Sequence, residues 1–478
     1  MARETDLIVI GAGPVGENVA DRARAAGLDV VIVERELVGG ECSYWACVPS
    51  KTLLRSPAAL RAAQRVPGAA EAVTGALDVE AVLRRRDAFV SNWSDEGGAA
   101  WLASVGIELV RGHGRLDGER RVVVEHADGT TTTLVARHAV AIATGSDAAM
   151  PRIDGLAESR PWTSREATSA EAVPARLAVI GGGVVGVEMA TAYAGLGAEV
   201  TVFARGGLLS GMEPFAGDAV ADGLRELGAV VHLGVTPDRV ARDDAGEVVL
   251  TLPGGEELRF DEVLVATGRT PRTDDLGLET VGLEPGEWID VDDALVARGV
   301  DGDWLSAVGD VTHRALLTHQ GKYQARAAGD AIAARALGRP VDDAPWGAHV
   351  ATADHRAVPS VVFAEPEVAS VGLTESAARE SGLEPRVVEV GLDSVSGTGI
   401  HSDGPAGRAK LVVDADRGVV IGATFVGQDV AELLQAATIA IVGEVPIDRL
   451  WHAVPAFPTV SEVWLRLLEA YGRPGAAA

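Results

Sequence analysis

The clearest pattern at the start of the chain is a short apolar run that leads into a glycine-rich turn. The run Leu7–Ile10 precedes Gly11 and is followed by helically spaced apolar positions over about 15–26 and by a second apolar run, Val30–Val33. Uninterrupted apolar runs of about four to eight residues are typical of buried strands, and a spacing of about three to four residues is typical of helices. The pattern predicts a β-α-β unit.

A second copy of this pattern begins near Leu177. It has a strand at Leu177–Ile180, a glycine turn, a helix through about Leu196 and a strand at 199–203. Two further runs, 138–144 and 263–267, each end in Ala-Thr and lead into a glycine, Gly145 and Gly268. The copies lie much farther apart than the about 20–45 residues of solenoid repeats, so they indicate two separate nucleotide-binding domains.

The pattern changes from about Pro345 onward. Strand-like runs at 360–363, 410–413 and 419–426 are followed by helical patterns near 430–442 and 461–471, and the tail from Arg473 is predicted to be disordered. We predict one domain from residues 1–146 and 271–345, a second from 147–270, and a third, α+β domain from 346–478. The predicted fold class is α/β with two Rossmann-like domains and this C-terminal α+β domain.

The first glycine turn has the spacing Gly11-x-Gly13-x-x-Gly16, and Glu34 ends the following strand. Glycines at these positions let the backbone approach a pyrophosphate at a helix N-terminus, and the acid accepts hydrogen bonds from a ribose hydroxyl. A bare glycine motif is weak evidence and also occurs in turns without a ligand. Its position between strand, helix and acid makes a dinucleotide site the stronger interpretation.

The second turn, Gly181-x-Gly183-x-x-Gly186, differs at the end of its second strand, which reads Ala204-Arg205. Without a carboxylate, a guanidinium can pair with a ribose 2′-phosphate. We therefore favour NADPH over NADH, although an arginine is also a common surface residue. Two turns of different polarity indicate two dinucleotides, and FAD with NAD(P)H is the simplest pair.

The composition limits the classes of binding partner and the cellular location that we expect. The chain of 478 residues carries a net charge of −27, which disfavours nucleic acid and anionic membranes as partners and also serves solubility. No apolar run reaches the about 20 residues of a membrane span, and the N-terminus lacks a secretory pattern, so we expect a cytoplasmic protein. Lysine occurs only at Lys51, Lys322 and Lys410.

The chain has only two cysteines, Cys42 and Cys47. Two thiols cannot form a closed four-thiolate metal centre, and we predict no metal site. Their closeness favours a joint redox role over two unrelated buried thiols. On a regular helix, five residues at about 1.5 Å each hold the Cα atoms too far apart for a disulfide, so a bond between them requires a distorted first turn.

The motifs add up to a family resemblance. The matching segments are Gly11–Gly16 with Glu34, Gly40-Glu41-Cys42 through Lys51, Ala143-Thr144-Gly145, Gly181–Gly186 with Glu188, Ala266-Thr267-Gly268-Arg269, Val308-Gly309-Asp310, Val361–Glu367 and Phe457–Glu462. Over nearly its whole length the chain resembles the flavoprotein disulfide reductases, which include dihydrolipoamide dehydrogenase, glutathione reductase and mercuric reductase.

The resemblance implies a role for each matching residue. Cys47 would be the charge-transfer thiol beside the flavin, and Cys42 the interchange thiol that faces the substrate. Lys51, if it is not an ordinary surface lysine, would pair with Glu188 near the flavin. The FAD-binding set would be Gly11, Gly13, Gly16, Glu34, Thr144, Gly145, Gly309 and Asp310, and the NAD(P)H-binding set Gly181, Gly183, Gly186, Arg205 and Gly268. The C-terminal domain would form a homodimer interface.

The closing segment departs from the thiol-specific members. They carry an acid–base histidine, supplied across the dimer, where this chain has Phe457, whereas the glutamate that orients it remains as Glu462. Such acid–base help is worth about 10²–10⁴ in rate. His452 is a candidate replacement but is more simply a packed residue, and His319, His355 and His401 have no distinguishing context. Mercuric reductase uses a C-terminal cysteine pair, which this chain lacks.

Three functions stay open at this point. The first is an enzyme that passes electrons from NAD(P)H through FAD to the Cys42–Cys47 disulfide and on to a disulfide or related small-molecule acceptor. The second is a NAD(P)H reductase of quinones or other acceptors in which the flavin is the main donor. The third is a non-catalytic flavin-binding component of a larger assembly.

Overall fold

A computed structural model describes residues 2–404 and 407–473, and the part of the predicted disordered tail beyond Arg473 lies outside the described residues. The chain divides into two compact units. The first consists of Met1–Pro49, Arg86–Ala149 and Arg269–Asp354, and the second of Ser50–Arg85, Met150–Gly268 and His355–Ala478. These units do not correspond one to one to the three predicted domains, whose boundaries stay a prediction.

The first unit is built on a seven-stranded sheet in the order β3-β2-β1-β6-β5-β4, with β16 paired to β6. Its strands are β1 (Arg3–Ile10), β2 (Val30–Glu34), β3 (Glu108–Arg111), β4 (His113–Leu116), β5 (Arg121–Glu125), β6 (Thr131–Ile142) and β16 (Leu305–Ala307). The strands β3, β2, β1, β6 and β16 are parallel, whereas β5 and β4 are antiparallel to their neighbours.

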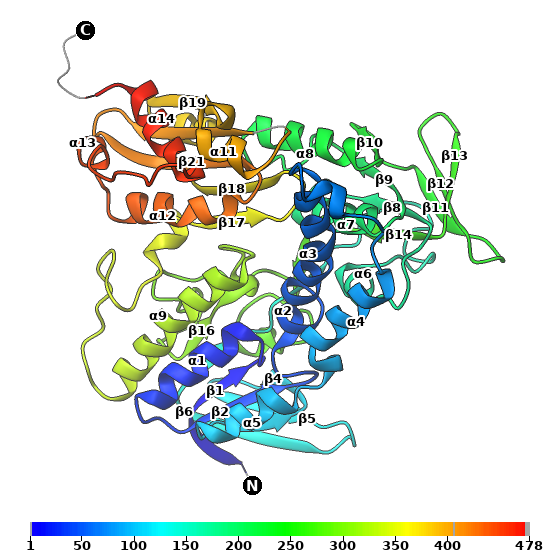
Figure 1. Cartoon of the computed structure of the whole chain (residues 1–478). Coiled ribbons are helices and arrows are strands. Elements are labelled where there is room, and N and C mark those ends of the chain that lie inside the picture. The colour runs from blue at the N-terminus through cyan, green and yellow to red at the C-terminus, as the bar shows by residue number, and fades with distance from the viewer. Residues whose placement is uncertain (1, 405–406, 474–478) are drawn as a thin grey trace. The chain divides into compact units, whose positions relative to one another are not determined.

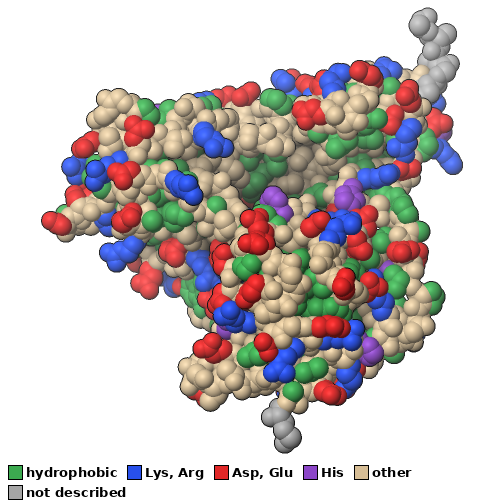
Figure 2. Space-filling model, turned by 180° about the vertical axis from the view of Figure 1, so that it is seen from behind, with side chains coloured by type: hydrophobic (Ala, Val, Ile, Leu, Met, Phe, Trp, Pro, Cys, Tyr) green, Lys and Arg blue, Asp and Glu red, His purple; other side chains and the backbone are tan. Residues whose placement is uncertain are grey.

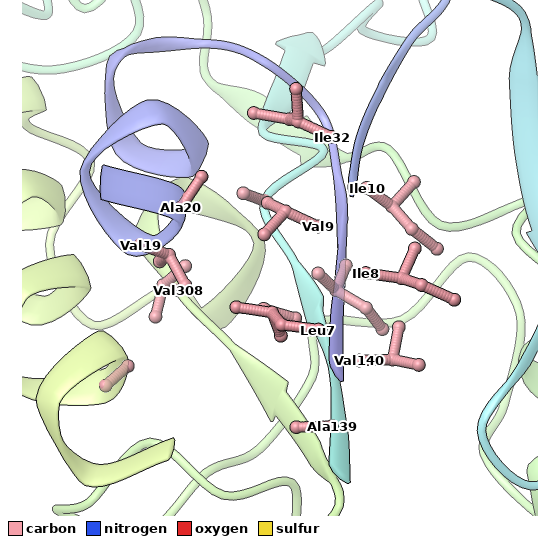
Figure 3. Close-up of a cluster of buried hydrophobic side chains, with 14 of the residues drawn as sticks. Leu7, Ile8, Val9, Ile10, Val19, Ala20, Ile32, Ala139, Val140 and Val308 are labelled. Atoms are coloured by element: carbon pink, nitrogen blue, oxygen red, sulfur yellow. The ribbon is translucent and has the colours of Figure 1, made fainter. Parts of the chain in front are cut away.

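Parallel strands explain the continuous apolar runs in the sequence, because such sheets are covered by chain on both faces. In the first unit, α1 (Pro14–Ala25) and α9 (Thr318–Ala336) pack against each other along the sheet (Figure 1). Figure 3 shows the resulting core: Val19 and Ala20 of α1 face Leu7 and Val9 of β1. These side chains are almost completely buried.

The second unit contains a four-stranded parallel sheet in the order β10-β9-β8-β14. Its strands are β8 (Arg176–Ile180), β9 (Glu199–Ala204), β10 (Val230–Leu233) and β14 (Glu262–Val265), and α7 (Val184–Gly195) and α8 (Pro214–Glu226) follow β8 and β9. A three-stranded antiparallel sheet joins β11 (Arg239–Arg242), β12 (Val248–Thr251) and β13 (Glu257–Phe260). The second β-α-β copy is therefore present as predicted.

The C-terminal part of the second unit is a five-stranded antiparallel sheet in the order β17-β18-β21-β20-β19. Its strands are β17 (Pro359–Val362), β18 (Glu367–Gly372), β19 (Pro385–Gly391), β20 (Arg408–Asp414) and β21 (Val419–Gly427), and its helices are α10 (Glu375–Glu380), α11 (Ser396–His401), α12 (Leu434–Val442), α13 (Ile447–Leu450) and α14 (Val463–Tyr471). The predicted fold class, with two Rossmann-like domains and an α+β domain, is confirmed.

The remaining elements are α2 (Gly40–Tyr44), α3 (Cys47–Gln64), α4 (Val79–Phe89), α5 (Glu96–Ser104), β7 (Ser146–Ala148), α6 (Ser164–Ser169) and β15 (Arg269–Pro271). Within the described part of the chain, no helix combines the length and the apolar character that a bilayer crossing needs. Acidic and basic side chains are interspersed over the face seen in Figure 2.

Candidate active site

The backbone of the first glycine turn leaves no space for a side chain at two of its three glycines. Gly11 has φ +101°, and a Cβ placed on it would lie 2.5 Å from the Ala143 carbonyl oxygen. A Cβ on Gly16 would lie 1.9 Å from the Gly11 carbonyl oxygen. Gly13, the N-cap of α1, has nothing within 4 Å of such a Cβ. The first and third glycines therefore allow close packing, and the second leaves the helix N-terminus open to an anion.

The neighbouring strands of the first unit end at the same edge of the sheet. The Ala143 amide donates to the Ile10 carbonyl at 2.8 Å, and the Val308 amide donates to the Ile142 carbonyl at 3.0 Å. This pairing brings the turns after β1, β6 and β16 together, and with them Gly11, Thr144, Gly145, Gly309 and Asp310. The carboxyl edge of a parallel sheet is where such folds bind ligands.

Two polar groups at this edge bear on a ligand. The Thr144 hydroxyl oxygen is buried and has no hydrogen-bond partner within the described residues. Asp310 Oδ2 accepts a hydrogen bond from the Ser146 hydroxyl at 2.7 Å, which orients its carboxylate. A buried hydroxyl without a partner is costly unless a bound group satisfies it.

Glu34 lies at the end of β2 and is buried. Its two oxygens accept hydrogen bonds from the backbone amides of Ala12 at 2.7 Å and Glu36 at 2.8 Å. Each carboxylate oxygen keeps a second lone pair, so the carboxylate is held in place and can still accept from a ribose hydroxyl.

The two cysteines lie on different helices. Cys42 is in α2, Cys47 begins α3, and Trp45 between them has φ −137° and ψ 6°, outside the helical region. This break is the distortion that a bond between the two sulfurs requires. The two cysteines are not joined in a disulfide in this structure, and both side chains are half-buried.

The thiols share a small hydrogen-bond network within the first unit. Cys47 Sγ lies 3.3 Å from the Thr318 hydroxyl at the start of α9. A hydrogen bond to Cys47 raises the pKa of Cys42 above its ordinary value, and burial adds to this rise, whereas Thr318 and the charge of Lys322 oppose it.

The second glycine turn repeats the first. Gly181 has φ +130° and its added Cβ would lie 2.2 Å from the Ala266 carbonyl oxygen, and a Cβ on Gly186 would lie 2.2 Å from the Gly181 carbonyl oxygen. Gly183 again has nothing within 4 Å. Gly268 has φ +150° and follows β14 on the same sheet edge.

The strand end of this second copy carries no acid. Ala204 ends β9 at the position that Glu34 occupies in β2, and it is buried. Arg205 follows it and is exposed. Among the described residues, the Arg205 guanidinium forms no ion pair.

Lys51 and Glu188 meet within the second unit. Lys51 Nζ on α3 donates to Glu188 Oε2 at 2.6 Å, and Glu188 on α7 is only 3% exposed. The Phe363 amide donates to Glu188 Oε1 at 3.1 Å, and the Lys51 ammonium lies 5.3 Å from the Phe363 ring centroid. Both carboxylate oxygens are thus satisfied by groups that no local sequence pattern brings together.

The closing segment differs in exposure along its length. Phe457 is 75% exposed, and His452 is also exposed. Glu462 is buried, and its Oε2 has no partner within the described residues. The buried acid has therefore been kept at a position where the group that it orients in the thiol-specific members is absent.

The predicted site residues separate cleanly between the units. Those predicted to bind FAD lie in the first unit with both cysteines, and those predicted to bind the nicotinamide dinucleotide lie in the second with Lys51, Glu188 and Glu462.

Comparison with protein families agrees with this arrangement. Residues 5–330 match the pyridine nucleotide-disulphide oxidoreductase model, and residues 358–467 match the dimerisation domain of the same family. The chain belongs to the pyridine nucleotide-disulphide oxidoreductase family. It is therefore an enzyme of the flavin-dependent disulfide oxidoreductase type, and the dimerisation domain supports a homodimer.

Individual relatives cover the chain almost end to end. It is 34% identical to a dihydrolipoyl dehydrogenase of Haloferax volcanii over 98% of this chain and 96% of that protein. It is 35% identical to a mercuric reductase of Streptomyces lividans over 94% of this chain and 92% of that protein. Among solved structures, LpdA from Mycobacterium tuberculosis is 26% identical, with a TM-score of 0.82, covering 97% of this chain and 99% of that one.

Members of this oxidoreductase family use FAD with NAD(P)H, and the first unit has features that fit FAD. The open helix end at Gly13, the fixed Glu34 and the buried hydroxyl of Thr144 lie on three turns of one sheet. These groups would hold a pyrophosphate, a ribose and a further polar atom of the cofactor.

Sequence reasoning missed several residues around the cysteines. Arg272 forms ion pairs with Glu41 and with Asp147, both at 2.6 Å, and so anchors the helix that carries Cys42. Lys322, one of the three lysines of the chain, acts on Cys42 through its charge, which lowers the pKa of this thiol. The scarcity of lysine was the one sequence signal that pointed to Lys322.

Proposed function

We propose that this protein is an NADPH-dependent flavoprotein that reduces a disulfide or a related sulfur acceptor through Cys42 and Cys47. The observation that carries the proposal is the contact between the two thiols at the broken junction of α2 and α3. Two sulfurs that share a hydrogen bond are close enough to form a disulfide with modest movement. No other cysteine exists in the chain to serve this purpose.

We assign one set of residues to binding FAD and another to supporting the thiols. FAD, when bound, supplies the two-electron step between the nicotinamide and the cysteine pair. Gly13 leaves space for its pyrophosphate, Glu34 would accept a hydrogen bond from its ribose, and Thr144, Gly145, Gly309 and Asp310 would line the rest of its site. The Thr318 hydroxyl lies 3.3 Å from the Cys47 sulfur, where it can donate a hydrogen bond to a thiolate.

Two residues of the second unit are assigned to positioning. Glu188 is buried and holds the Lys51 ammonium at a fixed point, because its other oxygen is tied to the Phe363 amide. We assign this pair to electrostatic support of the flavin reaction. Gly181, Gly183, Gly186 and Gly268 form the turns that receive the nicotinamide dinucleotide.

The preference for NADPH rests on the end of β9. A small Ala204 replaces the acid that would repel a 2′-phosphate, and the exposed Arg205 guanidinium is available for bidentate pairing. NADH would find no carboxylate there to bind its 2′-hydroxyl.

A second candidate function is the reduction of quinones or similar acceptors directly from the flavin. Phe457 favours it, because an exposed phenyl ring stands where a thiol-specific enzyme needs a proton-transfer group. In that case the cysteines store electrons without contacting the acceptor.

The test is Cys42→Ser, which removes the outer sulfur and leaves Cys47 in place. We expect loss of NADPH-dependent turnover with disulfides, measured alongside a quinone and with both NADH and NADPH. Wild-type turnover of the disulfides by this variant would refute the proposal, and loss of turnover with the quinone as well would exclude the direct route.

A spectroscopic control distinguishes a loss of folding from a loss of function. Two-electron reduction of the wild type should give a long-wavelength absorbance band from the Cys47 thiolate against the oxidised flavin. Cys42→Ser should show this band before any reduction, because it has no disulfide to accept the electrons, whereas Cys47→Ser should lack the band in either state. Equal spectra for Cys42→Ser and Cys47→Ser would contradict the assignment of Cys47.

A further inference from the structure

The helix α2, which carries Cys42, depends on its surroundings for its position. It has five residues, and a helix of this length is marginal in water without contacts to the rest of the protein. The Gly39 amide donates to the Ala12 carbonyl at 2.7 Å, and a Cβ on Gly40 would lie 3.0 Å from the Gly13 Cα atom. These backbone contacts hold the beginning of α2 against the first glycine turn.

A side-chain contact holds α2 from a second direction. Arg272 Nη2 donates to Glu41 Oε1 at 2.6 Å, and the side chains of Arg272 and Glu41 are only 15% and 18% exposed. Glu41 directly precedes Cys42, and neighbouring residues of a helix point about 100° apart around its axis. Arg272 therefore holds the helix without covering the face from which the Cys42 side chain projects.

Arg272 itself has a fixed position. Its backbone amide donates to the Gly145 carbonyl at 3.1 Å, and its Nε donates to Asp147 Oδ1 at 2.8 Å. Burial acts to lower the pKa of Arg272, but the hydrogen bonds and charges of Asp147 and Glu41 outweigh burial and raise this pKa, so the guanidinium stays charged. The contact to Glu41 is therefore made by a cation that is tied down at two other points.

Arg272 follows a two-stranded ribbon that also reaches the predicted flavin edge. The ribbon is the antiparallel pair of β7 and β15. Arg269 of β15 donates to the Ser146 hydroxyl at 2.9 Å and to the Ser146 carbonyl at 2.6 Å, and the Ser146 hydroxyl donates to Asp310 Oδ2 at 2.7 Å. One ribbon thus connects Asp310, which is predicted to bind FAD, with the helix of Cys42.

We propose that Arg272 is a positioning residue, which holds α2 through Glu41 so that the Cys42 sulfur stays within bonding reach of Cys47. The proposal rests on the proposed function and deepens it, because it assigns Arg272 to one step of the thiol–disulfide reaction. Arg272 acts through Glu41, and the role requires no contact between the guanidinium and either sulfur.

The acceptor R–S–S–R is reduced in two steps. The Cys42 thiolate attacks one sulfur, so that a Cys42–S–R bond forms and R–S⁻ leaves. The Cys47 thiolate then attacks the Cys42 sulfur, so that the Cys42–Cys47 bond forms, the Cys42–S–R bond breaks and the second R–S⁻ leaves. The acceptor gains two electrons from the dithiol, and the departing thiolates take up two protons from water, to which the two thiols have released theirs. The NAD(P)H- and FAD-dependent activity of the family restores the dithiol.

The contact between Arg272 and Glu41 should affect these two steps differently. The first step is bimolecular, and its rate depends on the accessibility and ionisation of Cys42. The second step takes place within the protein, and its rate depends on how often the Cys42 sulfur lies in line with Cys47. Positioning of reacting groups contributes orders of magnitude to the rate of such a step. Release of α2 should therefore slow the second step and leave the first nearly unchanged.

The first experiment separates the two steps in a single turnover. The holoenzyme is reduced with dithiothreitol, freed of it, and mixed with one equivalent of dithiobis(nitrobenzoate). Each step releases one coloured nitrothiobenzoate, the first at a rate that rises with concentration and the second at a rate that does not. In Arg272→Met we expect the second release to slow about tenfold and the first to stay within about twofold of wild type. Equal slowing of both releases, or of neither, would overturn the proposal.

Glu41→Ala removes the same contact from the other side and leaves Arg272 paired with Asp147. It should also slow the second release about tenfold, and it replaces Arg272→Met in the test if that variant does not fold or retain FAD. Because both changes remove one contact, the double variant should be no slower than either single variant. Multiplied losses in the double variant would mean that the two residues act independently, which would refute the proposed role.

The equilibrium of the cysteine pair gives a readout that a general loss of stability does not move. The holoenzyme is titrated in mixtures of reduced and oxidised dithiothreitol, and the long-wavelength band reports the dithiol form. Slower closure of the Cys42–Cys47 bond with unchanged opening should shift this equilibrium about tenfold toward the dithiol in Arg272→Met, or about 30 mV in midpoint potential. An equilibrium equal to that of the wild type would contradict the proposal.

Asp147→Asn is the matched control, because the Asp147 side chain is 52% exposed and its change leaves the contact between Arg272 and Glu41 in place. Both releases should stay within about twofold of wild type. Losses equal to those of Arg272→Met would overturn the assignment to Glu41. If Cys42→Ser keeps disulfide turnover, the proposed function itself fails. If Cys42→Ser is inactive while Arg272→Met shows both releases at wild-type rates, only the positioning role is refuted.

Discussion

The two glycine turns of this oxidoreductase solve the same backbone problem in the same way. In each, the first glycine has a positive φ and lies against the carbonyl of an Ala-Thr-Gly strand end, and the third lies against the carbonyl of the first. In each, the second glycine faces open space at a helix N-terminus. The backbone therefore provides a generic pyrophosphate site twice.

The side chains next to the turns differ, and they give each copy its own chemistry. After its third glycine the first copy reads Glu17-Asn18, whereas the second reads Val187-Glu188. Asn18 donates to the carbonyl of Pro14 within its own helix. Glu188, at the equivalent position, instead binds Lys51 from a distant segment. Equivalent positions on two copies of one fold thus serve unrelated purposes.

The strand ends differ in the same manner. The first copy ends with Glu34-Arg35 and the second with Ala204-Arg205, so the arginine is common to both and the acid is the variable. The comparison shows that the missing carboxylate, more than the guanidinium, distinguishes the two sites. Three predictions test this difference between the two copies.

The largest effect should come from the third glycines. Gly16→Ala would place a Cβ 1.9 Å from a backbone carbonyl oxygen, and Gly186→Ala would place one 2.2 Å from the equivalent oxygen of the second copy. Because backbone cannot yield as a flexible side chain does, we expect each change to lower the free energy of unfolding by about 3 kcal/mol. Chemical denaturation measures this loss.

The second glycines provide matched controls. Gly13→Ala and Gly183→Ala meet nothing within 4 Å, so stability should stay within about 0.5 kcal/mol of wild type. Gly13→Ala should instead reduce FAD retention, and Gly183→Ala should weaken nicotinamide binding. Equal destabilisation at the second and third glycines would contradict the shared geometry.

A smaller and asymmetric effect is expected at the Lys51–Glu188 pair. Lys51→Met leaves a carboxylate that is only 3% exposed without its cation, and should cost about 2 kcal/mol of unfolding free energy. Glu188→Gln leaves a lysine whose side chain is 37% exposed and can reach water, and should cost about 1 kcal/mol or less.

Thermal unfolding of both variants, with Asn18→Ala as the equivalent change in the first copy, tests the asymmetry. A greater loss in Glu188→Gln than in Lys51→Met would contradict it.

The smallest effect should be the change of nucleotide preference. Arg205→Ala should lower kcat/KM for NADPH about tenfold, or about 1.4 kcal/mol, because one exposed charge-assisted contact is lost. Ala204→Glu should lower it at least as much and raise kcat/KM for NADH. Steady-state kinetics with both nucleotides measures the change.

Arg35→Ala is the control at the equivalent position of the first copy and should leave the nucleotide preference unchanged. A loss of NADPH preference in Arg35→Ala equal to that in Arg205→Ala would refute the assignment of the 2′-phosphate contact.

Much of the architecture could be predicted from the sequence, because strands and glycine turns are local. The runs at Leu7–Ile10 and Leu177–Ile180 form parallel strands, and each is followed along the chain by the predicted helix. Predicted ends differed by a few residues, as at β6, which begins at Thr131 ahead of the expected apolar run. The break between Cys42 and Cys47 was also foreseeable, since a regular helix cannot bridge them.

Local patterns in the sequence were enough to predict two nucleotide-binding copies, a neighbouring pair of sulfurs and a third domain, since each follows from spacing within about 30 residues. The tertiary structure brings together charges that lie far apart along the chain: Lys51 meets Glu188, and Lys410 is buried between Glu213 and Glu375. Spacing along the chain carries no information about such pairs. Helix register and sheet order bring them together, and burial then requires each charge to have a partner.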